Sequence, residues 1–151
     1  ELPNVVVMQT LSKAWGSAGV RCGMAFAQPA IIALMNNVKY PYNVNMLTQQ
    51  FAIERLRRHD EVAQQVKTLL AERDWLIGQL GQTACVKHIY PTDANFVLVR
   101  VTDANAIYNA LLRQGIVVRN RSRVEKCEGC LRITVGTHDE NETLMKHLQE
   151  F

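Results

Sequence analysis

The sequence predicts an α/β protein in which a short first segment is joined by a long helix to a small α/β domain. After residue 81, short β-branched runs alternate with segments of helical apolar spacing. Residues 47–80 keep that spacing for longer than an ordinary globular helix does, and residues 1–46 are too few to form a domain alone. We therefore expect three parts: residues 1–46, a linking helix over 47–80, and a small domain over 81–151.

Composition and charge exclude several functional classes. Of the 151 residues, 48% are hydrophobic, which is enough to bury a core. The net charge of +3 comes from 17 basic and 14 acidic residues spread along the chain, too weak a bias to indicate a nucleic-acid or membrane surface. No apolar run is long enough to span a bilayer, and residues 1–4 do not resemble a signal peptide. We expect a soluble, cytoplasmic protein.

The four cysteines do not indicate a secreted disulfide framework. Only Cys127 and Cys130 have suggestive spacing, and a structural zinc site would need a second pair of ligands. The nearest candidates, His138 and His147, are spaced as neighbours on a helix. The preferred interpretation is a turn around Gly129 that leads into a strand, with no bound metal.

Strands and helices are expected at defined places along the chain. The β-branched and apolar runs predict strands over residues 4–8, 24–27, 85–90, 95–101, 116–120 and 131–136, the first of them buried. Helical spacing predicts helices over residues 29–37, 47–80, 104–114 and from 138 onward. The long segment over 47–80 is expected to bend near His59 and Asp60.

Three helix ends carry recognisable sequence signals. Asp103 precedes the helix over 104–114 as its N-cap, and Gly115 follows it. Thr137 precedes the last helix, with Glu140 three residues later, which is the pattern of a capping box. Gly81 marks the end of the long helical segment.

The segment "TLSKAWGSAGVRCG", from Thr10 to Gly23, places one lysine in a loop of small residues. Small residues let a ligand approach the backbone. A lysine in such a loop is a phosphate ligand, a covalent nucleophile toward a carbonyl, or a solvated charge, and spacing alone does not choose among them. A Walker-type loop is excluded because Ser12 precedes Lys13 and Ala14 follows it.

This segment resembles the lysine segment of class I/II pyridoxal-phosphate aminotransferases, which share the aspartate-aminotransferase-like fold. Among these it is most similar to the histidinol-phosphate aminotransferases. The stretches "DANFVLVR" (93–100) and "CLRITVGT" (130–137) agree with the same family, so the resemblance covers nearly the whole chain. It implies the C-terminal portion of that fold: the end of the large cofactor domain, the linking helix and the small α/β domain. We therefore expect a fragment truncated before Glu1.

The resemblance implies roles for four residues of the loop. Lys13 would bond covalently to the aldehyde of pyridoxal 5'-phosphate and later move a proton as general acid and base. Arg21, with Ser12 and Thr10, would hold the cofactor phosphate. The amine must be deprotonated for part of the cycle, which a nearby cation and a desolvated pocket favour.

Two arginines of the small domain are candidate substrate ligands. Arg132 interrupts an otherwise apolar strand and therefore needs an anionic partner. By the resemblance, Arg119 and Arg132 would bind the anionic end of the substrate, the alternative being structural ion pairs. Arg121 and Arg123 fit a solvated basic loop better.

The implied activity is transamination of histidinol phosphate with 2-oxoglutarate or glutamate in histidine biosynthesis, by a homodimer. Alternatives are another enzyme of the same fold, such as threonine-phosphate decarboxylase or an aromatic aminotransferase, or a noncatalytic anion-binding module. In the family, the aspartate, tyrosine and asparagine that contact the cofactor ring lie upstream of the lysine segment. We therefore expect the 151-residue chain alone to be inactive.

Overall fold

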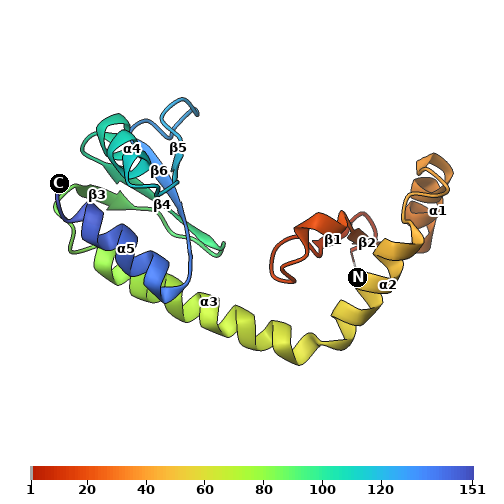
Figure 1. Cartoon of the computed structure of the whole chain (residues 1–151). Coiled ribbons are helices and arrows are strands. Elements are labelled where there is room, and N and C mark those ends of the chain that lie inside the picture. Colours follow the sequence, from red (N-terminus) through yellow and green to blue (C-terminus); the bar gives the residue numbers. More distant parts are fainter. Residues whose placement is uncertain (1) are drawn as a thin grey trace. The chain divides into compact units, whose positions relative to one another are not determined.

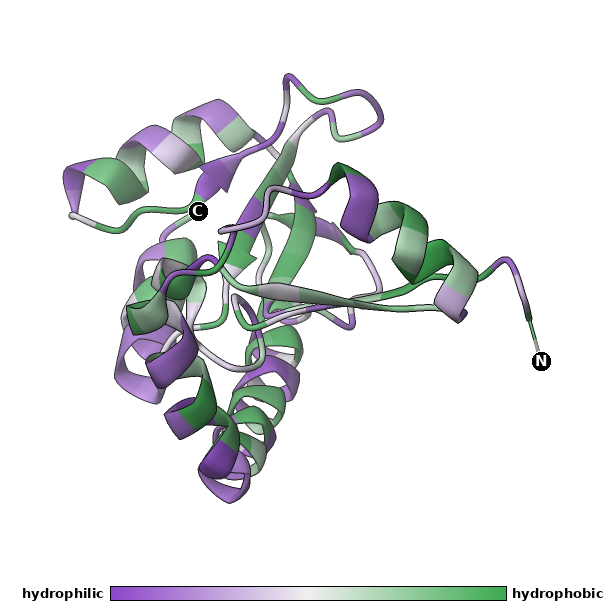
Figure 2. Cartoon of the chain, turned by 90° about the vertical axis from the view of Figure 1, so that its right-hand side faces the viewer, coloured by the Kyte–Doolittle hydropathy of each residue, from purple (hydrophilic) through white to green (hydrophobic). Residues whose placement is uncertain are grey.

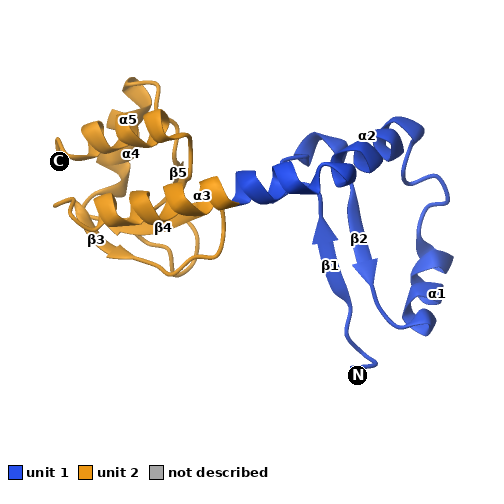
Figure 3. Cartoon of the chain, turned by 90° about the horizontal axis from the view of Figure 1, so that it is seen from below, with its two compact units in different colours: residues 1–66 blue, residues 67–151 orange. Residues whose placement is uncertain are grey.

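The computed structural model describes residues 2–151 in two compact units (Figure 3). Unit 1 ends at Val66, and unit 2 extends from Lys67 to Phe151. The elements are labelled in Figure 1. None of the helices described over residues 2–151 is both long and apolar enough to cross a membrane.

Unit 1 is built on a β-hairpin and helices. Strands β1 (Val7–Thr10) and β2 (Gly23–Phe26) pair antiparallel, with Val7 opposite Phe26 and Thr10 opposite Gly23. A single 3-10 turn, η1 (Ala18–Val20), lies in the loop between them. The helices are α1 (Pro29–Val38), α2 (Met46–Arg57) and the first part of α3 (His59–Leu80).

The prediction of a buried first strand over residues 4–8 is wrong. Strand β1 begins three residues later, and every residue in it is exposed, Met8 to 81%. Within the described residues the hairpin forms a sheet of only two strands, so neither of its faces is covered by a continuous second layer. β-branched sequence predicts a strand, but burial depends on what packs against it.

Unit 1 has little core of its own. Its buried apolar side chains are Leu11 and Val62. Large apolar side chains are instead exposed on α1, on α2 and on the connection between them, and the hydropathy along the chain is coloured in Figure 2. They include Leu34, Val38, Tyr40, Tyr42, Met46, Leu47, Phe51 and Ile53.

The helical segment expected over residues 47–80 is divided into two helices. Arg58 separates α2 from α3, with φ −96° and ψ 37°, outside the helical range. This interruption lies next to the bend expected at His59. The Asn45 side chain caps α2 by accepting a hydrogen bond from the backbone N–H of Thr48. The compact units divide inside α3, and the domain limits expected from the sequence stay a prediction.

Unit 2 contains a four-stranded antiparallel sheet with three helices. The strands are β3 (Val86–Ile89), β4 (Phe96–Val101), β5 (Arg119–Asn120) and β6 (Cys130–Thr134), in the spatial order β3-β4-β6-β5. Helices α4 (Ala104–Arg113) and α5 (His138–Leu148) join α3 in the same unit. The strand expected over residues 116–120 is reduced to the two residues of β5.

The core of unit 2 lies on one face of this sheet. Val97 and Val99 of β4 stand opposite Ile133 and Leu131 of β6, and all four are buried. Helices α3, α4 and α5 cover them with a further set of buried side chains, Leu76, Leu80, Ile107, Leu111, Leu144, Met145 and Leu148. Each fully buried Leu, Ile or Val contributes about 1.5–3 kcal/mol, so this layer fixes the register of the strands.

Both predicted helix caps of unit 2 are confirmed. The Asp103 side chain accepts hydrogen bonds from the first backbone N–H groups of α4. At α5 the Thr137 side chain accepts from the Glu140 N–H, and the Glu140 carboxylate accepts from the Thr137 N–H at 2.8 Å. The hydrogen bonds that the Thr137 N–H and hydroxyl donate to the Glu140 carboxylate lower the pKa of Glu140. The chain after α4 turns at Gly115, with φ +76°, a conformation that glycine adopts readily.

Helix α5 is tied to α3 by a polar cluster beside the core. His138 Nδ1 lies 3.2 Å from the Glu72 carboxylate, which also accepts a hydrogen bond from Asn141. Asn141 is only 2% exposed, and the Trp75 ring packs edge-on against His138. The other ring nitrogen of His138, Nε2, lies 3.5 Å from the Glu142 carboxylate, so both ring nitrogens face an acceptor, and the protonated ring can donate to both.

We expect this contact to make the stability of the chain depend on pH. The Glu72 hydrogen bond raises the pKa of His138 above 6.5, with smaller contributions from Glu142 and Asp139. A raised folded-state pKa gives stability that is complete below the unfolded pKa and is lost as pH rises through the folded value. The urea midpoint, followed by circular dichroism, should therefore fall from about pH 6.5 to about pH 8, and less so in His138→Gln.

His59→Gln is the matched control, because His59 is exposed at the start of α3 and its ion-pair contact is with the exposed side chain of Asp60. This variant should keep the pH dependence of the unsubstituted chain. An equal pH dependence in His138→Gln and the unsubstituted chain would show that the Glu72 contact contributes nothing.

Candidate functional site

The lysine loop is closed at its base by the β1–β2 hairpin. Residues 11–22 connect Thr10 to Gly23, which are paired across the two strands. The Leu11 N–H donates to the Cys22 carbonyl at 3.1 Å, and the Ser17 N–H donates to the Leu11 carbonyl at 2.9 Å. The Leu11 side chain is 1% exposed and fills the inside of the loop. The loop is therefore a fixed structure whose two ends are adjacent.

The structure places all four predicted cofactor residues at the base of this loop or within it. The Thr10 hydroxyl donates to the Ser12 hydroxyl at 3.0 Å and accepts from the Ser12 N–H at 3.1 Å. Lys13 is exposed, and its carbonyl accepts from the Gly16 N–H. The desolvated pocket expected around Lys13 is not formed by the described residues.

Arg21 reaches its position through an unusual backbone conformation. Its φ of 56° is left-handed, which is uncommon for a residue with a side chain. The guanidinium donates to the Ala18 carbonyl at 3.1 Å and is otherwise exposed. Its remaining donors are available to an anion at the end of the loop that leads into β2.

Side chains of α2 donate hydrogen bonds to backbone carbonyls of the loop. Arg55 donates from Nε to the Trp15 carbonyl at 2.9 Å and from Nη2 to Gln65 at 2.7 Å. Thr48 donates to the Val20 carbonyl at 3.4 Å. The sequence analysis missed Arg55, since one arginine on a charged helix carries no signal that its guanidinium caps a distant carbonyl.

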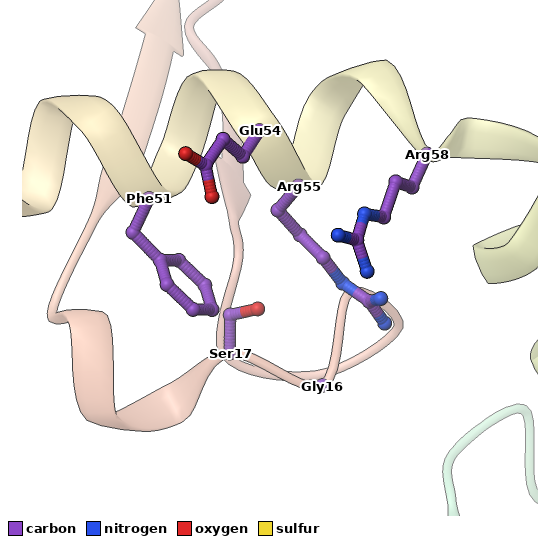
Figure 4. A pocket seen from close by; sticks show the side chains of 6 residues that line it. All are labelled: Gly16, Ser17, Phe51, Glu54, Arg55 and Arg58. Carbon is purple, nitrogen blue, oxygen red and sulfur yellow. The ribbon is translucent and has the colours of Figure 1, made fainter.

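A pocket of about 330 Å³ lies between α2 and the loop (Figure 4). It is lined by Gly16, Ser17, Phe51, Glu54, Arg55 and Arg58. Gly16 has φ +61°, and a β carbon there would meet the Arg55 guanidinium at 3.7 Å. The lining of the pocket includes the acidic Glu54 as well as Arg55 and Arg58, so it is less suited to an anion than a purely basic pocket. Arg55 also holds the loop through its hydrogen bond to the Trp15 carbonyl.

Arg119 and Arg132 form a pair across two strands. They stand directly opposite each other in the β5–β6 ladder, which places their β carbons about 5 Å apart on one face of the sheet. This is the face opposite the core, because Leu131 and Ile133 point inward. The structure therefore brings the two predicted substrate arginines together.

The arginine pair lacks a counter-ion among residues 2–151. Neither guanidinium makes an ion pair with an acidic side chain there. The Arg132 Nε is buried without a hydrogen-bond partner, and its guanidinium carbon lies 5.0 Å from the centre of the Phe96 ring. Like charges directly opposite in a sheet are destabilising, and a buried unpaired donor is costly. A bound anion would remove both costs.

The two neighbouring arginines lie outside this pair. Arg121 follows β5, and its backbone N–H donates to the Cys130 carbonyl at 2.9 Å. Arg123 is exposed in the loop that connects β5 to β6. Among the residues the structure describes, no group of three or more His, Cys, Asp and Glu side chains is arranged to hold a metal ion.

Comparison with known proteins assigns the chain to an enzyme family of this fold. Residues 1–148 match the family model described as aminotransferase class I and II. The chain belongs to this family. This agrees with the fold expected from the sequence, the later portion of an aspartate-aminotransferase-like fold.

The relatives carry a more specific name. The chain is 54% identical over 147 residues to a histidinol-phosphate aminotransferase from Parabacteroides distasonis, covering 97% of this chain and 43% of the relative. It is 26% identical, with a TM-score of 0.83, to the crystal structure of histidinol-phosphate aminotransferase from Sinorhizobium meliloti in complex with pyridoxal-5'-phosphate, covering 98% of this chain and 41% of that one.

A third comparison supports the fold alone. The crystal structure of the histidinol-phosphate aminotransferase from Clostridium acetobutylicum superposes with a TM-score of 0.88 at 21% identity, covering 96% of this chain and 45% of that one. The chain spans about 43% of the length of the curated relatives it matches.

Proposed function

We propose that this chain serves the pyridoxal-phosphate-dependent transamination of histidinol phosphate with 2-oxoglutarate, a step of histidine biosynthesis. The observation that carries the proposal is the opposed pair of Arg119 and Arg132, which lacks an anion on a chain 54% identical to a histidinol-phosphate aminotransferase. A phosphate monoester has the charge and the several acceptor oxygens that two guanidinium groups require.

The donor set of the lysine loop fits pyridoxal phosphate. An exposed primary amine, two hydroxyl groups and a guanidinium with free donors occur at the base of one closed loop. Thr10, Ser12 and Arg21 would hold the phosphate, and Lys13 would bind the aldehyde. When bound, the cofactor supplies the electron sink that makes a substrate carbon–hydrogen bond acidic.

Lys13 then acts as the base and acid of the reaction. Its amine would take the proton from the substrate α carbon as a base and would later return a proton as an acid. The loop backbone near the amine is fixed, because Arg55 donates to the Trp15 carbonyl and Thr48 donates to the Val20 carbonyl. Arg119 and Arg132 orient the substrate by its phosphate, so that only substrates with a distant anionic group are aligned.

We further propose that the protein acts as a homodimer in the cytoplasm. Support for association comes from the exposed apolar side chains of unit 1, including Val38, Tyr40, Tyr42 and Leu47. Exposed apolar area of this extent marks a surface that another protein surface covers. A chimera in which this chain replaces the matching segment of the Parabacteroides distasonis relative should sediment as a dimer, and a monomer would contradict the proposal.

The arginine pair is tested by ligand titration of the 151-residue chain. We expect Arg132→Gln to weaken binding of histidinol phosphate by about tenfold or more, because a charge-assisted hydrogen bond contributes about 1.5–3 kcal/mol. Isothermal titration calorimetry measures the affinity. Arg123→Gln is the matched control, since Arg123 is exposed in the neighbouring loop and should leave the affinity within about twofold.

Inorganic phosphate separates a substrate site from a generic anion patch. Binding of histidinol phosphate should be tighter than that of inorganic phosphate. Equal, weak binding of the two would indicate the noncatalytic anion-binding module instead. An unchanged affinity in Arg132→Gln would remove Arg132 from the site.

Lys13 is tested in the chimera with the Parabacteroides distasonis relative. Lys13→Arg keeps the positive charge but replaces the amine, so we expect transamination of histidinol phosphate to fall by at least about 100-fold, the contribution of one general acid–base group. Lys39→Arg is the control, because Lys39 ends α1 outside the loop. Transamination that survives Lys13→Arg would overturn the assigned role, and preference for phenylalanine would favour an aromatic aminotransferase.

A further inference from the structure

We infer that Cys127 and Cys130 form a thiol-modification site, in which the two thiols are converted to a reversible disulfide by exchange with an oxidised low-molecular-weight thiol. The evidence is the turn that holds the two residues, the direction of the Cys130 sulfur and the difference in exposure between the thiols. The inference does not depend on the proposed function.

Cys127 and Cys130 are the two ends of one tight turn. The Cys130 N–H donates to the Cys127 carbonyl at 3.0 Å, and Gly129 at the third position has φ +69°. A turn closed by this hydrogen bond has its end α carbons within about 7 Å. Disulfides form between α carbons about 4.4–6.8 Å apart. The backbone therefore already has a separation that a disulfide accepts.

The Cys130 sulfur faces back into this turn. Its Sγ lies 3.7 Å from the carbonyl oxygen of Glu128, the residue that follows Cys127. Cys130 is buried, whereas Cys127 is partly exposed, and both are free thiols. An incoming reagent therefore meets Cys127 first, and Cys130 lies behind it as the resolving thiol.

A positive charge stands beside the inner thiol. Arg100 of β4 is the residue opposite Cys130 of β6. A hydrogen bond from the Arg100 guanidinium to Cys130 raises the pKa of Arg100. The same charge stabilises the negative sulfur that develops during exchange, which is the setting in which protein thiols react.

The exchange balances in two steps. The Cys127 thiolate attacks one sulfur of the small disulfide, forming a mixed disulfide and releasing one thiolate. The Cys130 thiolate then attacks the Cys127 sulfur and displaces the second thiolate. The two protons lost by the cysteines pass to the two released thiolates, and two electrons pass from the protein to the reagent. Excess dithiol reverses both steps.

The site lies at the end of the ladder that carries the arginine pair. The Arg121 N–H donates to the Cys130 carbonyl, and beyond this hydrogen bond β5 and β6 separate into the connecting loop. Arg132 is two residues along β6. A disulfide here closes the base of that loop beside the opposed pair of Arg119 and Arg132.

One tryptic peptide reports the reaction without any substitution. Cleavage after Lys126 and after Arg132 releases "CEGCLR", which contains both cysteines and no other. The native 151-residue chain is incubated with oxidised glutathione, and free thiols are then blocked with iodoacetamide. The chain is digested with trypsin, and the peptides are analysed by mass spectrometry. We expect this peptide to be unalkylated and lighter than its dithiol form by the mass of two hydrogen atoms. After reduction with dithiothreitol and a second treatment with iodoacetamide, it should carry two alkyl groups.

The other two cysteines are internal controls. Cys22 is partly exposed but has no nearby cysteine in the sequence, so it should carry glutathione or remain alkylatable. Cys85 is buried, its thiol contacts the Leu148 carbonyl, and burial raises the pKa of that thiol, so it should react last. A "CEGCLR" peptide with two alkylated thiols, or with glutathione still on Cys127, after Cys22 has reacted would overturn the inference.

Two variants separate the roles of the thiols and the turn. In Cys130→Ser, glutathione added to Cys127 should persist, because no second thiol displaces it. In Gly129→Ala, the left-handed turn is strained, and the disulfide should form several-fold more slowly than in the unsubstituted chain. Rapid loss of glutathione from Cys127 in Cys130→Ser would contradict the assigned order.

Discussion

The alternation of side chains along β6 is the constraint on which the arrangement of unit 2 depends. Leu131 and Ile133 must point toward the helices, because they complete the core with Val97 and Val99. A strand places successive side chains on opposite faces. Arg132 is therefore forced onto the other face, opposite Arg119. The same alternation places Cys130 beside Arg100, so burial of two apolar side chains positions both the arginine pair and the thiol pair.

Unit 1 uses a different constraint, the closure of a loop by a hairpin. The pairing of Thr10 with Gly23 joins the two ends of the lysine loop, so residues thirteen positions apart in the sequence are neighbours. The backbone N–H and carbonyl of Leu11 and the guanidinium of Arg55 make hydrogen bonds in place of the regular ones that a twelve-residue connection lacks. Rigidity near Lys13 therefore comes from contacts made by residues that take no part in chemistry.

The sequence predicted the local features well because their causes are local. A capping box at Thr137 needs only residues within one helical turn, and the alternation in β6 needs only neighbours on one strand. A bend next to Arg58 was expected from the sequence, but the exposure of β1 was not predictable in the same way. That exposure depends on what lies across space, as does the hydrogen bond from Arg55 to the Trp15 carbonyl, and a single sequence contains no direct signal of such contacts.

The two units differ in how much buried core supports the candidate site residues of each. Apart from Leu11 and Val62, every buried apolar side chain lies in unit 2, so the arginine pair stands on a sheet with a complete core beneath it. The lysine loop stands on a two-stranded hairpin with exposed faces and has only α2 as a brace. The proposed substrate binding by charge requires two fixed guanidinium groups, which unit 2 provides. The proposed proton transfer by the Lys13 amine also requires exclusion of water, which would come from surfaces that cover the exposed apolar side chains of unit 1. In the proposed reaction, recognition of the anion and chemistry at the lysine therefore have different structural requirements.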